Sequence, residues 1–366
     1  MESMSEFSQK QDRIQTLLEE RKLDALLLRR VSSFAWATCG AASYVNGATT
    51  NGEAALVMSP SGRHVVTNNI EARRLEREEK LTAQGWDFRV VPWYEAQDTV
   101  AELTRGLRLG ADGPYPGVTD LSDDLAHLRA HLLPEEGERF RALGRLCAEA
   151  IESTARMVSP GQTEYQIAGV LAREAQSRGV QAIVNLIATD RRVFDFRHPL
   201  PTDKKLERYA MLVLCGRKGG LVASLTRLVH FGSLPHELRG KQEAVAQVDA
   251  AFIAASRPGA RIADIFRKGV EAYAKVGYPD EWKLHHQGGL AGYEPREHVA
   301  TPASSQVVKA GQAFAWNPSI TGTKSEDTIL SGEMGCEVIT ATEDWPRIPV
   351  QVEGQLIERP AILEVA

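Results

Sequence analysis

Three short segments in the second half of the chain carry side chains that could exchange protons. His198 lies in a proline-rich segment, His285 and His286 are neighbours, and Glu326 belongs to a Ser-Glu-Asp-Thr sequence. An imidazole near its ordinary pKa can donate or accept a proton at neutral pH without a metal ion. If the three segments meet in the fold, they form a site with several titratable groups, which favours a catalytic role.

Each of these residues also has a purely structural interpretation. His198 could be a surface histidine in a loop beside Pro199. If His285 and His286 lie on a strand, their side chains point to opposite faces, so we expect only one of them to enter the site. Glu326 could simply accept hydrogen bonds from strand backbone, although a carboxylate buried without a partner is costly.

Helices separated by Pro-Gly pairs must position these segments. Apolar residues recur at helical spacing in residues 132–158, Pro160 and Gly161 end that helix, and Thr163 opens the next one with a capping pattern. The arrangement is repeated later, where helices at 242–255 and 263–276 flank a second Pro-Gly pair. Each helical pair is followed by segments that are typical of strands.

The front of the chain has a pattern of its own. Short apolar strands are predicted between two helices, and a mixed α/β layer domain is the usual result of such alternation. The predicted helices are residues 12–21 and 96–107, and the predicted strands are 24–28, 52–58, 63–67 and 88–92. We therefore predict two domains, residues 1–133 and 134–366, with the boundary at Pro134.

Residues 311–330 resemble a motif pair of the pita-bread superfamily, which includes creatinase, proline dipeptidase and methionine aminopeptidase. In that superfamily one strand carries Glu-Pro-Gly and the next carries Glu-Asp-Thr; here Asn317-Pro318-Ser319 and Glu326-Asp327-Thr328 correspond. The front of the chain is similar to the amino-terminal domain of creatinases and proline peptidases. The resemblance implies an α/β (α+β) fold, a creatinase-type N-terminal domain followed by a pita-bread domain with an internal pseudo-twofold, and a homodimer.

The superfamily's metal site uses five ligand residues. The resemblance implies that this chain keeps one of the five. When the hairpin is aligned on Thr226-Arg227 and the histidine motif on the HHQGGLAG sequence, the five positions hold Leu214, Ser224, Gly289, Asn317 and Glu326. Residues 211–232 contain no Asp or Glu, so no shift restores the aspartates. A single carboxylate with a serine and an amide cannot hold two divalent ions at useful affinity. We expect neither a metal nor another cofactor.

Creatinase provides a metal-free precedent, since it hydrolyses a C–N bond with a histidine as the proton shuttle. The Arg-His-Pro-Leu-Pro-Thr-Asp sequence stands where the resemblance places that histidine, although ordinary peptidases of the superfamily also have a substrate-contacting histidine there. We therefore predict that the catalytic residues are His198, Glu326 and His285. The predicted substrate-binding residues are Asn317, Arg296, His286, Ser224 and Cys215.

Creatine itself is not favoured as the substrate. Leu225 follows Ser224 at the position where creatinase has a carboxylate, and a guanidinium needs bidentate acceptors. Arg296 and Lys324 add positive charge to the neighbourhood. These features favour a neutral or anionic amide.

Two further features of these segments stay open. Cys215 could be a nucleophile with His198 as its base, but a cysteine on a buried strand is usually a small hydrophobic residue. Gly288 and Gly289 permit close approach either of a ligand or of another strand, and the sequence alone is compatible with both.

Composition excludes several classes of partner. With 366 residues, 43% of them hydrophobic, the chain can bury two ordinary cores. A net charge of −5 without a concentrated basic segment disfavours nucleic acid. No apolar run is long enough for a membrane span, and the polar start of the chain does not resemble a secretory signal. Four widely spaced cysteines indicate reduced thiols, and we expect a cytoplasmic protein.

Three functions are compatible with the sequence. The first is a metal-independent hydrolase of a small amide, amidine or peptide-like C–N bond. The second is a noncatalytic protein that binds peptides or partners on a peptidase scaffold. The third is a proline-specific aminopeptidase or dipeptidase whose metal ligands have been misaligned. The retained titratable residues favour the first, with a small molecule or peptide as substrate.

Overall fold

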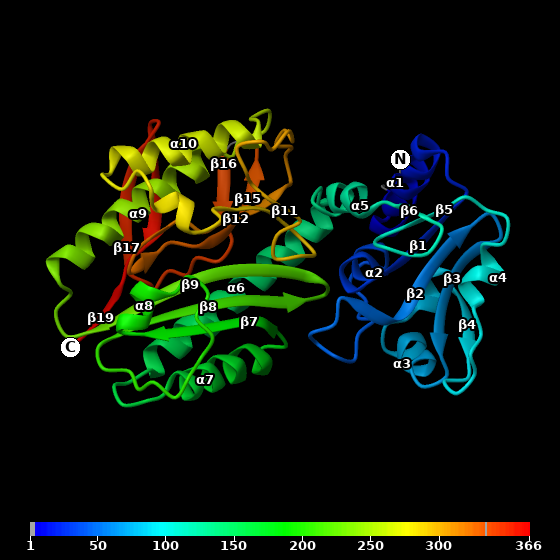
Figure 1. Ribbon diagram of the computed structural model, residues 1–366, viewed down its shortest axis with the longest axis horizontal. Helices are drawn as coiled ribbons and strands as arrows, with labels where there is room; N and C mark the ends of the chain where they lie inside the picture. The colour runs from blue at the N-terminus through cyan, green and yellow to red at the C-terminus, as the bar shows by residue number, and fades with distance from the viewer. Residues whose placement is uncertain (1–3, 334) are drawn as a thin grey trace. The chain divides into compact units, whose positions relative to one another are not determined.

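The computed structural model describes residues 4–333 and 335–366 of the chain. The chain divides into two compact units, one formed by Met1–Arg129 with Gly219–Leu221 and the other by Ala130–Lys218 with Val222–Ala366. Each unit combines sheets with helices (Figure 1). The α/β class predicted from the sequence is confirmed.

A six-stranded sheet forms the first unit, with the strand order β4-β3-β2-β1-β5-β6. Its strands are β1 (Ala25–Arg30), β2 (Asn51–Ser59), β3 (Gly62–Asn68), β4 (Asp87–Val91), β5 (Leu109–Ala111) and β6 (Thr119–Asp120). Its helices are α1 (Glu6–Arg21), α2 (Val31–Ala37), α3 (Ala72–Arg77), η1 (Leu81–Gln84), α4 (Thr99–Leu103) and α5 (Ser122–Arg129). The predicted strands match β1 to β4 closely. Helix α4 begins later than predicted because Asp98 caps its first turn, with Oδ1 accepting from the Ala101 amide at 2.9 Å. It also ends earlier, at Leu103.

The second unit begins with two helices and a four-stranded sheet. Helices α6 (Pro134–Met157) and α7 (Glu164–Ser177) precede β7 (Gln181–Thr189), α8 (Arg191–Asp195), β8 (Tyr209–Lys218) and β9 (Leu221–Phe231). The C-terminal strand β19 (Leu363–Val365) joins β9, so the order is β19-β9-β8-β7. The predicted cap of α7 is present, since Thr163 and Gln166 form a capping box.

The helical pair and sheet are then repeated. The helices are α9 (His236–Ala255), α10 (Ile262–Lys275) and η2 (Glu281–Leu284). The strands are β10 (Gly288–Ala291), β11 (His298–Val299), β12 (Ala313–Trp316), β13 (Ser319–Ile320), β14 (Thr323–Lys324), β15 (Asp327–Gly332), β16 (Gly335–Val338), β17 (Arg347–Val352) and β18 (Gln355–Pro360). Five of them form a sheet in the order β11-β10-β12-β15-β16.

Strand β9 connects the four-stranded and the five-stranded sheet of the second unit. The Thr226 amide donates to the Glu326 carbonyl at 3.1 Å, and the Ser224 amide donates to Thr328 Oγ1 at 2.8 Å. Residues of β9 and residues next to β15 are therefore held side by side. The candidate residues at 224 and 326, about a hundred positions apart in the sequence, come together for this reason.

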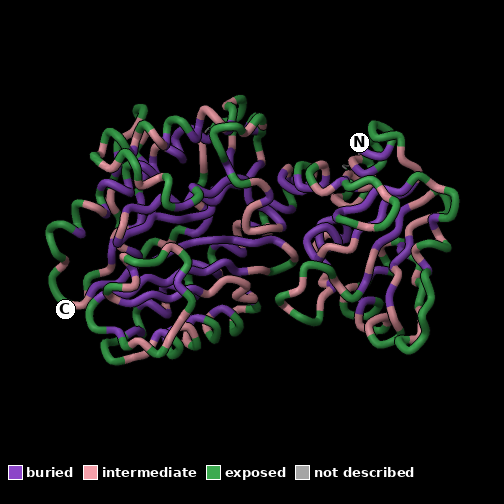
Figure 2. The backbone as a smooth tube through the Cα atoms, in the orientation of Figure 1, coloured by how far each residue is buried: buried purple, intermediate pink, exposed green. Residues whose placement is uncertain are grey.

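The interior beside this junction is apolar and tightly packed. Strands β8, β9, β12 and β15 are almost wholly buried, and Figure 2 shows the buried segments running through the middle of the second unit. On β12, Trp316 stacks on Phe252 of α9 with ring centroids 4.7 Å apart and on Phe314 at 5.5 Å. This packing fixes the end of β12, where the chain continues into Asn317.

Candidate active site

Glu326 is the central carboxylate of the site, and both of its oxygens are already bound. Lys324 Nζ lies 2.7 Å from Oε2, Thr226 Oγ1 donates to the same oxygen at 2.6 Å, and Arg296 Nη2 donates to Oε1 at 3.0 Å. The side chains of Glu326 and Lys324 are 3% and 5% exposed. Although burial alone would raise the pKa of Glu326, Lys324 and Arg296 lower it to about 2. The carboxylate is therefore ionised at neutral pH.

Two side-chain cations thus surround one carboxylate. Because Arg296 and Lys324 each carry a positive charge and Glu326 one negative charge, the group as a whole has one excess positive charge. Arg296 also donates from Nη1 to Ser224 Oγ at 3.2 Å. Its Nε atom is buried and has no hydrogen-bond partner within the described part of the chain. A buried donor of this kind is available to an anionic or carbonyl oxygen of a ligand.

The five positions at which the superfamily holds its metals do not fit a dinuclear site here. Leu214 has no donor atom, and Ser224 Oγ is shared between Arg296 and Cys215 Sγ, 3.2 Å away. The oxygens of Glu326 are occupied by cations and a hydroxyl. Lys324 and Arg296 thus place positive charge beside Glu326, where two metal ions would otherwise bring it.

The role of Gly288 and Gly289, which the sequence did not decide, is to let neighbouring strands approach closely. A Cβ atom on Gly289 would lie 2.1 Å from the His298 carbonyl oxygen of β11, and one on Gly288 would lie 2.0 Å from the Ala315 carbonyl oxygen of β12. Both glycines also have positive φ angles, 98° for Gly288 and 153° for Gly289. Close approach of strands, rather than of a ligand, explains them.

Asn317 follows β12 directly opposite Glu326. Trp316 pairs with Asp327 in the antiparallel register of β12 and β15, so the next pair along the ladder is Asn317 with Glu326. Asn317 is 2% exposed, and its Oδ1 atom has no hydrogen-bond partner among the described residues. An acceptor buried without a partner is costly unless a ligand or water satisfies it.

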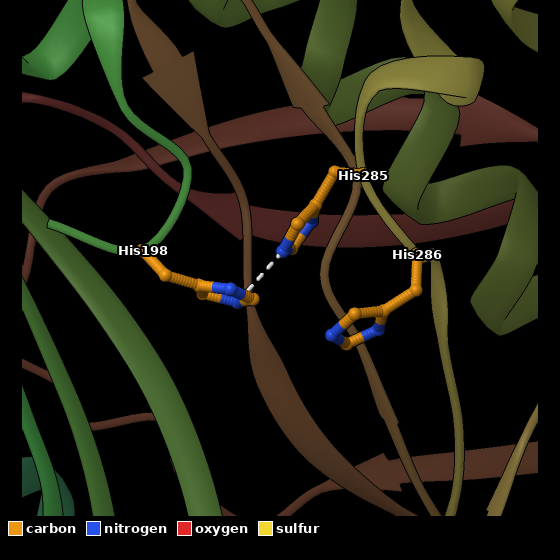
Figure 3. A group of neighbouring side chains, drawn as sticks. All are labelled: His198, His285 and His286. Atoms are coloured by element: carbon orange, nitrogen blue, oxygen red, sulfur yellow. Dashed lines mark hydrogen bonds between the residues drawn. The ribbon is translucent and has the colours of Figure 1, made fainter.

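The three candidate histidines form a cluster. His198 Nε2 and His285 Nε2 lie 3.0 Å apart, and one of them donates to the other. The ring centroid of His286 lies 4.5 Å from that of His285 and 5.8 Å from that of His198 (Figure 3). The predicted opposite orientation of His285 and His286 is wrong. These residues precede β10 and follow the 3-10 helix η2, so the alternation of a regular strand does not apply to them.

A half-buried ion pair fixes the two segments that carry these histidines. Arg197, next to His198, donates to Glu281 Oε2 at 2.7 Å, and Glu281 opens η2, which leads to His285. Thr321 donates to the same carboxylate from its amide at 3.0 Å. The histidine cluster is therefore positioned before any ligand binds.

The loop that carries His198 is anchored at both ends by carboxylates. Glu164, which is fully buried, accepts from the Thr189 amide at 2.8 Å and from the Thr202 amide at 3.0 Å. Asp190, whose φ of 51° is unusual for a residue other than glycine, accepts from the Arg208 amide at 2.8 Å. Strained backbone of this kind persists where surrounding contacts hold it, often beside functional sites.

Burial and the neighbouring cations keep the histidines neutral. Burial, with Lys324 as the next cause, lowers the pKa of His285 to about 2. His286 and His198 are more exposed than His285, and their desolvation is partial; this desolvation and Arg296 lower the pKa of His286 to about 4, while desolvation and Lys324 lower the pKa of His198. Neutral imidazoles have a free lone pair, so they can accept a proton or bind a metal ion.

Cys215 is the predicted site residue least suited to a catalytic role, because its thiol is not activated as a nucleophile. Its thiol is buried, and burial raises its pKa, so it is protonated at neutral pH. An activated cysteine has a lowered pKa. Cys215 Sγ accepts a hydrogen bond from Ser224 Oγ at 3.2 Å, which links it to the site.

Sequence reasoning missed the ion pair between Lys324 and Glu326. A signal for it was present, because residues two apart in an extended segment point to the same face. Thr226 as a donor to Glu326 was missed as well, since its hydroxyl reaches the site only through the contact between β9 and the strand segment at 326.

Within the second unit, carboxylate, histidine and amide side chains come together beside the contact between β9 and the segment before β15. Residues 138–339 match the model of metallopeptidase family M24, and residues 10–123 match that of the creatinase/prolidase N-terminal domain. The chain belongs to metallopeptidase family M24.

Relatives in this family are distant in sequence. An uncharacterized peptidase of Staphylococcus haemolyticus is 24% identical over 233 residues, which cover 60% of this chain and 65% of that protein. The Xaa-Pro dipeptidase of Pyrococcus furiosus is 25% identical over 238 residues, 61% of this chain and 66% of that protein. The chain thus aligns with slightly less than two thirds of the length of these relatives.

Solved structures show the same fold. The prolidase of Pyrococcus horikoshii superposes with a TM-score of 0.78 at 17% identity, covering 92% of this chain and 99% of that one. The N-terminal domain of the FACT complex subunit SPT16 from chickpea superposes with a TM-score of 0.71 at 13% identity, covering 92% and 96%. In the part of the chain that the structure describes, no helix is long and apolar enough to cross a membrane.

Proposed function

We propose that this protein is a metal-independent hydrolase of a small amide, amidine or peptide-like C–N bond. The observation that carries the proposal is the binding of Glu326 by both Lys324 and Arg296. These cations supply the positive charge that metals supply in a dinuclear site, and they are beside neutral histidines that can move protons. The family membership and the peptidase relatives support hydrolysis as the reaction class.

His198 acts as the acid/base in this proposal. With its pKa lowered, the neutral ring takes a proton from water, and the resulting hydroxide attacks the carbonyl or amidine carbon. The oxygen or nitrogen that gains negative charge is stabilised by Lys324 and Arg296, because preorganised cations in a buried site favour developing charge. Protonated His198 then gives its proton to the leaving nitrogen, so the net change is addition of water across the C–N bond.

His285 holds His198 in place for this step. The 3.0 Å contact between their Nε2 atoms leaves one ring as donor and the other as acceptor. The buried Nδ1 atom of His285 has no partner within the described residues. His285, the unpartnered Nε of Arg296 and the unpartnered Oδ1 of Asn317 provide polar contacts for the substrate.

The excess positive charge favours a substrate with a carboxylate or another anionic group. A guanidinium substrate would meet Arg296 and Lys324 and only one carboxylate that is already neutralised. Small acylated amino acids and dipeptides combine an amide with a carboxylate, and they are the first compounds to test. The homodimer and the cytoplasmic location implied by the resemblance stay predictions.

A noncatalytic binding protein is the second candidate. The structural likeness to the SPT16 domain shows that this fold also occurs in a subunit of the FACT complex. The neutral histidine cluster favours catalysis over that alternative. A conventional proline-specific metallopeptidase is disfavoured because its ligand positions hold Leu214, Gly289 and a Glu326 that is already paired with two cations.

The decisive experiment is a hydrolysis screen of N-acyl amino acids, dipeptides and small amidines with metal-depleted protein. We expect turnover that chelators do not reduce, and a loss of about 10²–10⁴-fold in the His198→Ala variant. The control is His236→Ala, at an exposed position on the first turn of α9. Turnover that appears only with added Mn²⁺ or Co²⁺, or that survives in His198→Ala, contradicts the proposal. Peptide binding without turnover of any compound supports the second candidate.

A further inference from the structure

The histidine cluster has the composition of a mononuclear metal centre. His198, His285 and His286 each offer one ring nitrogen, and these three atoms lie within 4.8 Å of one another. Figure 3 shows the rings of His285 and His286 directed toward His198. None of the three is among the ligand positions of the dinuclear site, which are 214, 224, 289, 317 and 326.

The geometry is close to that of three ligands around one ion. Tetrahedral Zn²⁺ with Zn–N bonds of about 2.0–2.1 Å separates its nitrogen ligands by about 3.3 Å. The observed separation of the His198 and His285 nitrogens is 3.0 Å. The nitrogen of His286 lies within 4.8 Å of the other two, so metal binding requires this exposed ring to move closer to them.

The protonation state also suits a metal. Imidazole must be neutral to bind an ion, and all three histidines have a lowered pKa. Three imidazoles with an open fourth position are a set that binds Zn²⁺, Cu²⁺ or Ni²⁺ in preference to Mg²⁺ or Ca²⁺. The segments that carry them are already fixed by the pair Arg197–Glu281, so little ordering is needed on binding.

Lys324 and Arg296 set a limit on the affinity. Both cations act on the histidines electrostatically, and Glu326 compensates only one of them. A doubly charged ion at the cluster is therefore repelled by the remaining positive charge, and a small anion such as chloride or hydroxide in the fourth position reduces this repulsion. We therefore expect the ion to bind reversibly, and we do not expect the fold to depend on it.

We propose that His198, His285 and His286 form a site for a single borderline transition-metal ion, with Zn²⁺ as its main occupant, and that Zn²⁺ bound there blocks the proton transfer of His198. A metal on the lone pair of His198 prevents this ring from accepting a proton, so occupancy and acid/base catalysis exclude each other. The blocking effect rests on the proposed hydrolase function, whereas the binding does not.

Zn²⁺ binding to metal-depleted protein by calorimetry tests the site directly. We expect one ion per chain and a visible absorption band of tetrahedral geometry when Co²⁺ replaces Zn²⁺. His286→Ala should weaken binding by more than tenfold, and because this residue is exposed the variant is expected to fold. His236→Ala, at an exposed histidine of α9, should leave the affinity unchanged.

The outcomes separate binding from catalysis. Loss of hydrolysis on addition of stoichiometric Zn²⁺, with recovery on chelation, supports both parts of the proposal. Specific binding to a protein without hydrolase activity keeps the metal site and removes the proposed function. No binding at one ion per chain, or binding that His286→Ala and His236→Ala alter equally, overturns the metal site even if the protein is an active hydrolase.

Discussion

Removal of Lys324 should reveal whether the side-chain cations around Glu326 stabilise the fold. In Lys324→Met the length of the side chain is kept and its charge is lost, so Glu326 keeps only Arg296 and Thr226 as partners. Breaking a buried ion pair by removing one partner costs about 3–5 kcal/mol. Because two partners remain, we expect about 3 kcal/mol, which lowers the Tm of a unit of this size by about 6–12 °C.

A double-mutant cycle with Glu326→Gln separates the pair from its surroundings. Glu326→Gln leaves two buried cations without a carboxylate, so its cost should equal or exceed that of Lys324→Met. The double variant should be about 2 kcal/mol more stable than the sum of the single changes, as expected for directly contacting charges. The measurement is denaturant unfolding of the four proteins.

An exposed ion pair of the same residue types provides the control. Lys268 Nζ lies 2.5 Å from Glu353 Oε1, and the two side chains are 47% and 42% exposed. Lys268→Met should cost about 1 kcal/mol or less. Equal costs for Lys324→Met and Lys268→Met, or restoration of the Lys324→Met protein by Mn²⁺, would refute the replacement of metal charge by these side chains.

Three further predictions concern single groups. Lowering the pH from about 6.5 to about 5 should reduce the free energy of unfolding by about 2 kcal/mol through His285 alone. The unfolded ring takes up a proton over this range, whereas the folded ring, with a pKa of about 2, does not. Urea unfolding at both pH values measures the difference. Gly289→His places a histidine at the position of the superfamily's histidine ligand, but the new Cβ atom would lie against the His298 carbonyl oxygen. The Tm should therefore fall by several degrees. Asn317→Glu should yield neither Mn²⁺ binding in calorimetry nor aminopeptidase activity, because the cations on Glu326 remain.

Matched variants separate these effects from general damage. The stability contribution of His285 has a definite sign: it is complete above the pKa of the unfolded ring and is lost as the pH falls below it. His285→Gln should remove this part of the pH dependence, and His236→Gln should not. Gly169 lies in α7 with nothing within 4 Å of an added Cβ, so Gly169→Ala should leave the Tm unchanged or raise it. A pH dependence that persists in His285→Gln, or a Gly289→His protein as stable as the parent, contradicts the corresponding reasoning.

The long helices of the second unit were predictable from sequence because their apolar residues recur at helical spacing. Predicted segments 132–158 and 263–276 correspond to α6 and α10 with shifts of one or two residues. The buried helix α2 was missed, since all seven of its residues are buried and it has no polar face that produces a period. Helix α1 extends further forward than predicted because Ser5 caps it and Lys10 is buried against the Trp36 carbonyl oxygen.

The identities of the site residues were accessible from sequence, whereas most of their contacts were not. Motif resemblance pointed to His198, His285 and Glu326, which the structure places close enough to influence one another electrostatically. The contact of Arg296 with Glu326 depends on how β10 and β15 are arranged around β12, which no local pattern encodes. The mutual approach of His285 and His286 depends on backbone that is neither helix nor strand.

The cations on Glu326 also bear on how this lineage can change over time. A variant with one added metal ligand would still have Lys324 and Arg296 bound to Glu326, and a variant that first lost Lys324 would leave Arg296 as the one cation paired with Glu326. Natural selection acts on single substitutions, and a typical stability of about 5–15 kcal/mol tolerates few such steps. Under the proposed metal-independent function, a change to metal-dependent chemistry would therefore require several coupled substitutions around Glu326, and homologues that keep this lysine should not bind a pair of ions there.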